Sequence, residues 1–257
     1  MKNSVIEKLV ALNREFYQTF TSSFSATRSQ VQPGVKKIAA HFPKDSNILD
    51  VGCGNGNLMQ VLQKNDFRGT YAGVDFSENL IRECQRISQT SNNQLAFQTK
   101  FDVFDLALSD WNIFPIKMDW DVICAFAVFH HIPGKHTRSA IFRQIRSMLK
   151  PEAEFVFSVW QPQNSSRLTK RFLVWDQMGL QEIDVEEGDY LLDWRAEQSS
   201  NNKIGFRYVH IFNEQELKGL AAETGFSISN SVYSDGKEGN VGLYQVWKKK
   251  SNPCVEK

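Results

Sequence analysis

The stretch Asn47-Ile-Leu-Asp-Val-Gly-Cys-Gly-Asn-Gly56 decides the fold of this chain. It reads as a short apolar strand that runs into a glycine-rich turn, and a helix is expected to follow from about Asn57. Glycine lacks a Cβ and adopts positive φ freely, so such a turn lets a ligand lie directly against backbone. The free N–H groups at the start of the helix would face the same ligand. The segment therefore predicts a strand–turn–helix unit built around a small molecule.

The spacing of the glycines indicates which small molecule. The pattern Gly52-x-Gly54-x-Gly56 differs from the G-x-G-x-x-G turn that binds a dinucleotide pyrophosphate, and Asp50 precedes it at the end of the strand. A carboxylate in that position would repel pyrophosphate but would suit an ammonium group. A ligand that combines a nucleoside with a free amino acid fits best, which points to S-adenosylmethionine. The alternative is that the glycines are purely structural.

A second strand, Thr70-Tyr-Ala-Gly-Val-Asp75, also ends in an acid. A carboxylate at this place can accept hydrogen bonds from both ribose hydroxyls of a nucleoside. Asp75 has a simpler alternative role as a cap of the helix that begins near Ser77.

Asp102 follows the third strand and could accept a hydrogen bond from the exocyclic amine of adenine, while neighbouring backbone N–H groups bond the ring. Its alternative is a turn aspartate that bonds its own backbone.

The fourth strand and its exit loop, Trp120 to Ile132, should line the place where the ligand reacts. His130 and His131 lie in that loop, but adjacent residues of an extended segment point in different directions and no carboxylate or cysteine cluster accompanies them. We expect one histidine to pack in the core and the other to touch the cofactor, and we expect no metal site. Tyr17 could close over the cofactor as part of an N-terminal lid, or could simply pack in the core.

The candidate cofactor-contacting residues are Tyr17, Asp50, Gly52, Cys53, Gly54, Asn55, Gly56, Asp75, Phe76, Asp102, Val103 and Phe126.

Strand and helix signals alternate from residue 47 to about 160, which predicts an α/β fold with a parallel, Rossmann-like sheet and helices on both faces. The expected strands are 47–52, 70–75, 95–101, 120–127 and 153–160, and the expected helices are 56–64, 77–90 and 135–149. Residues 161–206 break the alternation and read as an insertion after the fifth strand. A helix near 213–224 and a hairpin of 226–233 with 240–247 would close the sheet with an antiparallel last strand.

We expect residues 1–46 to form a helical N-terminal lid and residues 47–257 to form the main domain, with the insertion 161–206 on its substrate side. Hydrophobic residues make up 41% and charged residues 23% of the chain, values typical of a globular protein. No apolar run is long enough for a membrane span, the N-terminus lacks a secretory apolar core, and the four cysteines form no C-x-x-C pair. A cytoplasmic location without membrane attachment is therefore expected.

The net charge of +1 gives no bulk attraction to nucleic acid. The charge is unevenly distributed, because residues 1–46 hold seven Lys or Arg against three Asp or Glu, and residues 161–210 hold six against eight. A polyanion would therefore contact the N-terminal segment more readily than the acidic insertion.

These motifs resemble the class I S-adenosylmethionine-dependent methyltransferases, and the resemblance covers residues 47–160. It implies a seven-stranded sheet with an antiparallel last strand and S-adenosyl-L-methionine as the methyl donor.

A narrower resemblance spans nearly the whole chain. Its elements are Tyr17, Phe24-Ser-Ala-Thr-Arg28, Ala127-Val-Phe-His-His-Ile132, Ser158-Val-Trp-Gln161, Asp189-Tyr-Leu-Leu-Asp-Trp194 and Arg207-Tyr-Val-His-Ile-Phe212. Together they look like the eukaryotic tRNA methyltransferases that esterify 5-carboxymethyluridine at the wobble position, a group that includes the methyltransferase domain of the AlkB-homologue tRNA enzyme. The resemblance implies tRNA as a partner and a small zinc-binding activator protein.

The chain departs from that group at several positions. Asp193 stands where the group has proline, Val209 replaces a tyrosine, and Pro151-Glu-Ala replaces Pro-Gly-Gly. The N-terminal element Ser29-Gln-Val-Gln-Pro33 lacks the group's aromatic and proline pair. These departures leave the cofactor motifs intact and concern the substrate side.

Methyl transfer from a sulfonium is an in-line displacement that depends on alignment of the nucleophile. A carboxylate nucleophile is already ionised at neutral pH and needs no general base. It needs a cation to hold it, and the candidate catalytic residues are Arg28 and Arg207, flanked by Tyr208 and His210. Alternate residues of a strand share a face, so Arg207 and Val209 would face one way and Tyr208 and His210 the other. If the latter pair faces the pocket, Arg207 becomes a structural ion-pair partner.

Three functions remain open from the sequence. The first is esterification of a carboxylate on a tRNA wobble uridine, with Trp194, Phe206 and Tyr208 available to stack an unpaired base. The second is methylation of a small carboxylate, phenol or amine beneath a lid formed by the insertion, which would need no basic surface. The third is a non-catalytic S-adenosylmethionine-binding subunit.

Overall fold

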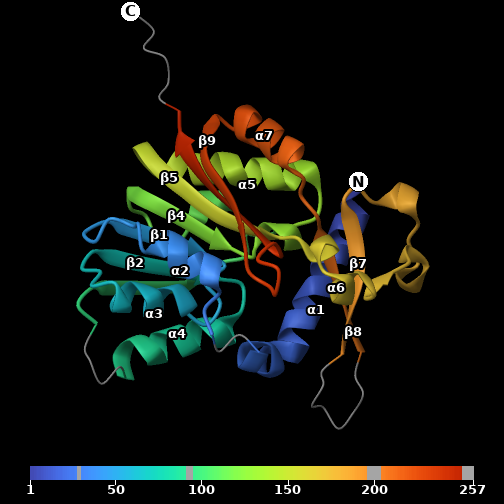
Figure 1. The fold of residues 1–257 in the computed structure, drawn as a ribbon, viewed down its shortest axis with the longest axis horizontal. Helices are drawn as coiled ribbons and strands as arrows, with labels where there is room; N and C mark the ends of the chain where they lie inside the picture. Colours follow the sequence, from blue (N-terminus) through green and yellow to red (C-terminus); the bar gives the residue numbers. More distant parts are fainter. Residues whose placement is uncertain (28–29, 91–94, 196–203, 251–257) are drawn as a thin grey trace, which may run out of the picture.

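A seven-stranded sheet forms the centre of the molecule (Figure 1). The computed structural model describes residues 1–27, 30–90, 95–195 and 204–250. The strand order is β3-β2-β1-β4-β5-β10-β9, and β10 is antiparallel to both of its neighbours while β1 to β5 are parallel. The strands are β1 (Asn47–Val51), β2 (Thr70–Asp75), β3 (Gln98–Val103), β4 (Trp120–Phe126), β5 (Leu149–Trp160), β9 (Phe226–Ser234) and β10 (Gly242–Lys249). The expected fold class is confirmed.

Helices cover both faces of this sheet, as expected (Figure 1). The helices are α2 (Pro33–Ala39), α3 (Asn57–Lys64) and α4 (Glu78–Thr90) on one face, with α5 (Lys135–Met148) and α7 (Glu214–Glu223) on the other. Leu49 and Phe157 pack toward α5 and α7, whereas Ile48 and Val156 pack toward α2 and α3. Neighbouring strand residues thus serve opposite faces, as the two-residue period of a strand requires.

Two strand boundaries differ from those expected. β3 runs from Gln98 to Val103 rather than from 95 to 101, because β2 offers backbone partners from Thr70 to Asp75 in register with Gln98 to Val103. Asp102 therefore lies within the strand. β5 begins at Leu149 rather than at 153, because Leu149 pairs with Trp120 at the start of β4 before a register shift.

A second, three-stranded antiparallel sheet follows β5. It consists of β6 (Phe172–Leu173), β7 (Asp189–Arg195) and β8 (Ile204–His210), and its last strand runs past residue 206, where the insertion was expected to end. The short helix α6 (Ser166–Thr169) precedes it, together with several turns of 3-10 helix.

The long helix α1 (Asn3–Thr27) lies along β8 (Figure 1). Its side chain Leu9 packs with Leu191 and Tyr208 of the small sheet. A Cβ on Gly205 would lie 2.4 Å from the ring of Phe20, so the glycine permits the close approach of helix and strand. The N-terminal helix and the small sheet therefore form one packed unit beside the carboxyl end of β5. Within the described residues, no helix is long and apolar enough to cross a membrane.

Candidate functional site

The glycine turn after β1 has the backbone conformation that its sequence predicts. Gly52, Gly54 and Gly56 have φ values of +76°, +56° and +77°, which side-chain-bearing residues rarely adopt. A Cβ on Gly52 would lie 2.5 Å from Val128 in the loop after β4, whereas a Cβ on Gly54 would meet open space. The turn is thus packed against the β4 exit on one side and open to a ligand at Gly54.

Asp75 lies directly beside this turn. Its carboxylate accepts hydrogen bonds from the backbone N–H of Gly54 at 3.0 Å and of Ser77 at 2.9 Å. Burial raises the pKa of this carboxyl to about 6, and the two backbone hydrogen bonds oppose that rise. Each oxygen can accept a further bond, so the helix-capping role and the proposed ribose contact are compatible.

Asp50 is buried at the end of β1, and the hydroxyl of Tyr71 donates a hydrogen bond to it at 2.8 Å. Burial raises the pKa of Asp50 to about 7; the bond from Tyr71 lowers it and the charge of Asp75 raises it further. Two buried acids therefore flank the open turn. This donor set fits an ammonium group and a ribose diol.

The remaining candidates for cofactor contact surround the turn. Cys53 and Cys84 are buried beneath it, and the thiol of Cys84 donates to the carbonyl of Gly54 at 3.2 Å. Asp102 and Val103 are exposed at the end of β3, where Asp102 accepts a bond from the N–H of Val103. The residues Asn55, Phe76 and Phe126 are half-buried.

Tyr17 reaches the same edge of the sheet from α1. Its hydroxyl lies 2.6 Å from Nε2 of His131, and its ring centroid lies 6.2 Å from that of Phe76, directly after Asp75. His131 is the half-buried histidine of the pair, and Nδ1 of the buried His130 accepts a bond from the N–H of Trp160. We expected one of these histidines to pack in the core, as His130 does, and the other to touch the cofactor. His131 is the one beside Tyr17, and it is added here to the candidate site residues.

The guanidinium of Arg207 lies against a cluster of three aromatic side chains that was not predicted from the sequence. It stands 4.5 Å from the ring centroid of Trp160, at the carboxyl end of β5, and 5.5 Å from those of Phe16 and Trp194. Cation–π contacts of this kind hold a guanidinium in place. Arg207 is 5% exposed, so the cation is fixed within the packed unit of α1 and the small sheet.

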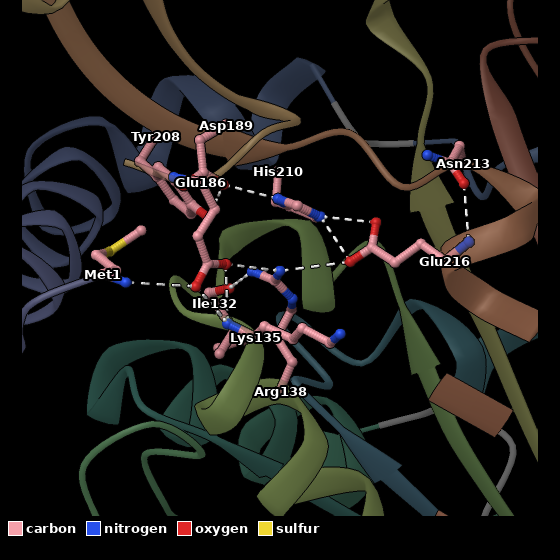
Figure 2. Close-up of polar contacts among 10 residues, drawn as sticks. All are labelled: Met1, Ile132, Lys135, Arg138, Glu186, Asp189, Tyr208, His210, Asn213 and Glu216. Carbon is pink, nitrogen blue, oxygen red and sulfur yellow. Dashed lines mark hydrogen bonds and ion pairs between the residues drawn. The ribbon is translucent and has the colours of Figure 1, made fainter. Parts of the chain in front are cut away.

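Tyr208 and His210 face away from Arg207, as the strand period predicts, and enter a buried polar network (Figure 2). The hydroxyl of Tyr208 and Nδ1 of His210 both lie 2.7 Å from Oδ1 of Asp189. Tyr208 is fully buried, so the expectation that it could stack an unpaired base is wrong. Arg28 lies outside the described residues.

No group of three or more His, Cys, Asp or Glu side chains in the described part of the chain is arranged to hold a metal ion. The structure therefore brings together the glycine turn, Asp50, Asp75 and Tyr17. It places Arg207 beside the carboxyl end of β5. Tyr208 and His210 lie apart from the glycine turn and from Arg207.

Comparison with known proteins agrees with this geometry. A family model described as a methyltransferase domain matches residues 24–230. A tRNA (carboxymethyluridine(34)-5-O)-methyltransferase of Schizosaccharomyces pombe is 24% identical over 228 residues, which cover 85% of this chain and 90% of that protein. The enzyme of the same description from Arabidopsis thaliana is 27% identical over 157 residues, covering 60% of this chain but only 34% of its own length.

A relative with a different acceptor also matches. A malonyl-[acyl-carrier protein] O-methyltransferase of Halalkalibacterium halodurans is 31% identical over 152 residues, covering 58% of this chain and 52% of that protein. Among solved structures, an S-adenosylmethionine-dependent methyltransferase of Methanosarcina mazei superposes with a TM-score of 0.64 at 21% identity, covering 87% of this chain and 100% of that one. The likeness to that structure concerns the fold.

Proposed function

Because the chain belongs to the methyltransferase-domain family, we propose that it transfers the methyl group of S-adenosylmethionine to a carboxylate oxygen, on a 5-carboxymethyl group of a tRNA wobble uridine. The observation that carries the choice of a carboxylate is the position of Arg207. Its guanidinium is held on Trp160 at the carboxyl end of β5, the same edge of the sheet as the glycine turn.

The methyl donor fits the residues after β1 and β2. Asp50 would hold the ammonium group, the open backbone at Gly54 would lie against the amino acid portion, and Asp75 would accept the ribose hydroxyls. Asp102 and Val103, at the neighbouring end of β3, would face the adenine. The bound donor supplies an electrophilic methyl group on a sulfonium.

The acceptor side needs alignment more than it needs a base. A carboxylate is ionised at neutral pH, so the protein has to place one of its oxygens in line with the methyl group and exclude water. A guanidinium binds a carboxylate through two parallel hydrogen bonds, which fixes its direction. Tyr17 and His131 stand between the two halves of the site, where they would close it against solvent.

An RNA acceptor is supported by the relatives and by the aromatic side chains near Arg207. Two of the relatives that share the tRNA description match over 85% and 60% of this chain. Trp194 is half-buried, and Arg171 stacks on it with the guanidinium 6.0 Å from the ring centroid. An aromatic ring with a cation beside it is the usual means by which proteins hold an unpaired base next to its phosphate.

The second candidate function is methylation of a small or carrier-bound carboxylate. The relative described as a malonyl-[acyl-carrier protein] O-methyltransferase favours it, because malonyl and carboxymethyl groups both present a free carboxylate. The net charge of +1 favours it as well, since nucleic-acid enzymes usually present a basic face. Both candidates assign the same role to Arg207 and differ in what surrounds the carboxylate.

Transfer of labelled methyl from S-adenosylmethionine to bulk tRNA, followed by mild alkali, tests the proposal. The assay is run with the chain alone and with the zinc-binding activator of a related enzyme. Alkali-labile label on tRNA is the expected result, because a methyl ester is hydrolysed under these conditions. Alkali-stable label would move the acceptor to another atom, and absence of label with both preparations would favour the small-carboxylate function.

A further inference from the structure

A buried polar network joins the small sheet to the helices of the large one, and His210 lies at its centre (Figure 2). Nδ1 of His210 is 2.7 Å from Oδ1 of Asp189, at the start of β7. Nε2 is 3.0 Å from both oxygens of Glu216, in the first turn of α7. The imidazole therefore bridges two carboxylates that belong to different parts of the fold.

The number of hydrogens that these contacts need defines the protonation state of the imidazole ring. An ionised carboxylate only accepts hydrogen bonds, and a neutral imidazole carries one N–H. Asp189 already accepts bonds from the hydroxyl of Tyr208 at Oδ1 and from the N–H of Glu186 at Oδ2. With both carboxylates ionised, both contacts of His210 are satisfied together only when both ring nitrogens carry a hydrogen, which makes His210 an imidazolium.

The charges around the ring agree with that state. Negative groups come from the loop before β7, from β7 and from α7, and positive groups come from α5 and the chain start. They include Glu186, Asp189, Glu216, Arg138 and the amino group of Met1, together with the hydroxyl of Tyr208 and the side chain of Lys135, whose backbone N–H also bonds Glu186. Nη2 of Arg138 lies 3.1 Å from Glu186 and 3.4 Å from Glu216. With His210 protonated, its positive charge lies between the carboxylates of Asp189 and Glu216.

The network also fixes β8, the strand that carries Arg207, the residue proposed to hold the acceptor carboxylate. Arg207 and His210 both belong to β8, and Arg207 lies on its opposite face. The carbonyl of Tyr208, on the same strand, is 3.3 Å from Nδ1 of His131 beside the cofactor site. A shift of β8 relative to α7 would therefore move groups on both sides of the acceptor.

We propose that His210 is a positioning residue of the acceptor site: its two N–H groups, one toward Asp189 and one toward Glu216, fasten β8 to α7 and so fix Arg207, and loss of one of the two hydrogens loosens this connection as pH rises. The role of Arg207 in this statement rests on the proposed function. The connection itself is a property of the fold and can be measured without any acceptor.

The direction of the pH effect follows from the surroundings of the ring. Burial alone lowers the pKa of His210, but the hydrogen bonds to Asp189 and Glu216 outweigh burial, and the pKa is raised above its ordinary 6.5. The positive charge of Arg138 opposes that rise. A group with a raised pKa stabilises the folded state at low pH, and this stabilisation is lost as the pH increases through the raised value.

The direct test is a titration of the ring nitrogens by NMR, using the whole chain with ¹⁵N-labelled histidine. The signals of His210 are assigned from the spectrum of His210→Gln. The expected result is an imidazolium that loses its proton above pH 6.5, the ordinary pKa of a histidine. A ring that titrates at or below pH 6.5 would overturn the proposal, and neither result depends on the identity of the acceptor.

The functional test compares acceptor and cofactor parameters as the pH increases. In His210→Gln we expect the KM for the acceptor to rise about tenfold and the Kd for S-adenosylmethionine to change less than about threefold. The wild-type KM should rise through the titration of His210, and the variant should lose that step. An equal loss of cofactor affinity, or an unchanged pH profile, would contradict a positioning role.

Two further variants serve as an independent test and a control. Glu216→Gln keeps the shape and an oxygen for Nε2–H but removes a charge, so it should shift the KM transition to lower pH; an unshifted transition would count against the proposal even if His210→Gln did not fold. His136→Gln makes the same change at an exposed histidine on α5, and it should leave the profile unchanged.

Discussion

The hydroxyl of Tyr17 lies 2.6 Å from Nε2 of His131, so the helix that precedes the sheet is bonded to the loop that follows β4. Nδ1 of His131 faces the carbonyl of Tyr208 at 3.3 Å, and a carbonyl only accepts hydrogen bonds. Nδ1 therefore carries the hydrogen, and in the neutral ring Nε2 accepts the hydroxyl of Tyr17. This arrangement brings helix, exit loop and small sheet together over the proposed methyl-transfer position.

Tyr17→Phe removes this hydrogen bond and keeps the ring against Phe76. We expect the Kd for S-adenosylmethionine to stay within about threefold and the unfolding free energy to fall by roughly 1 kcal/mol. Tyr17→Ala also removes the ring and should weaken cofactor binding more than Tyr17→Phe does. Calorimetric titration of the two variants separates the contributions, and equal affinities for both would refute a contact between the ring and the cofactor.

Asp75→Ala should weaken S-adenosylmethionine binding by about a hundredfold or more, because it removes the acceptor of the ribose hydroxyls and leaves the N–H groups of Gly54 and Ser77 without their partner. The matched control is Asp102→Ala at the exposed end of β3, which should have a smaller effect. Fluorescence or calorimetric titration measures both. If Asp75→Ala binds S-adenosylmethionine as tightly as the wild type does, Asp75 serves only as a helix cap.

The affinity for S-adenosylmethionine should depend on pH through Asp50. Its pKa in the free protein is raised to about 7, and an ammonium group binds the ionised form. Affinity is therefore expected to fall as the pH drops below about 7, by up to about tenfold per pH unit, with Asp75 contributing below about 6. Asp50→Asn should bind weakly and lose the step near 7. A wild-type Kd that is flat across this range would argue against the ammonium contact.

The raised pKa of Asp50 also predicts that the stability of the folded protein falls as the pH rises, whereas the cofactor affinity rises. Because the folded pKa of Asp50 lies above 3.8, its contribution to stability is present at low pH and is lost as the pH rises through about 7. Without ligand, Asp50→Asn should therefore be more stable than the wild type at about pH 8, by roughly 1–4 kcal/mol. Thermal unfolding at about pH 5 and about pH 8 measures the difference, which should shrink at the lower value.

Arg207→Gln should lower kcat/KM for the acceptor by about a hundredfold while the Kd for S-adenosylmethionine stays nearly constant. Arg207→Lys keeps the charge but loses the paired hydrogen bonds and much of the stacking on Trp160, so an intermediate loss is expected. Arg171→Gln, which alters the stacking on Trp194, should mainly affect an RNA acceptor. Parallel losses of kcat/KM and cofactor affinity in Arg207→Gln would place this residue in the structural framework instead.

The large sheet and the backbone of the glycine turn could be predicted because local sequence constrains them. Three glycines at fixed spacing need positive φ, and a buried strand followed by an acid leaves few alternatives for Asp50 and Asp75. The ends of β3 and β5 were less accurate, since they depend on the register of a neighbouring strand rather than on their own composition.

The acceptor side was harder to predict because its contacts are distant in sequence. The two-residue period correctly separated Arg207 from Tyr208 and His210, but it does not indicate which face meets the pocket. That depends on Asp189 and Glu216, which come from β7 and α7 and make one face a buried charge network. The cluster of Phe16, Trp160 and Trp194 around Arg207 likewise joins three separate elements.

The most direct measurement uses two synthetic anticodon stem-loops that differ only at the wobble position, one with uridine and one with 5-carboxymethyluridine. Each is incubated with the protein and S-adenosylmethionine, with and without the activator of a related enzyme, and its nucleosides are analysed by mass spectrometry. The proposed function predicts one added methyl, removable by mild alkali, on the carboxymethylated loop alone and its near absence in Arg207→Gln. Methylation of both loops, or of neither, would contradict it.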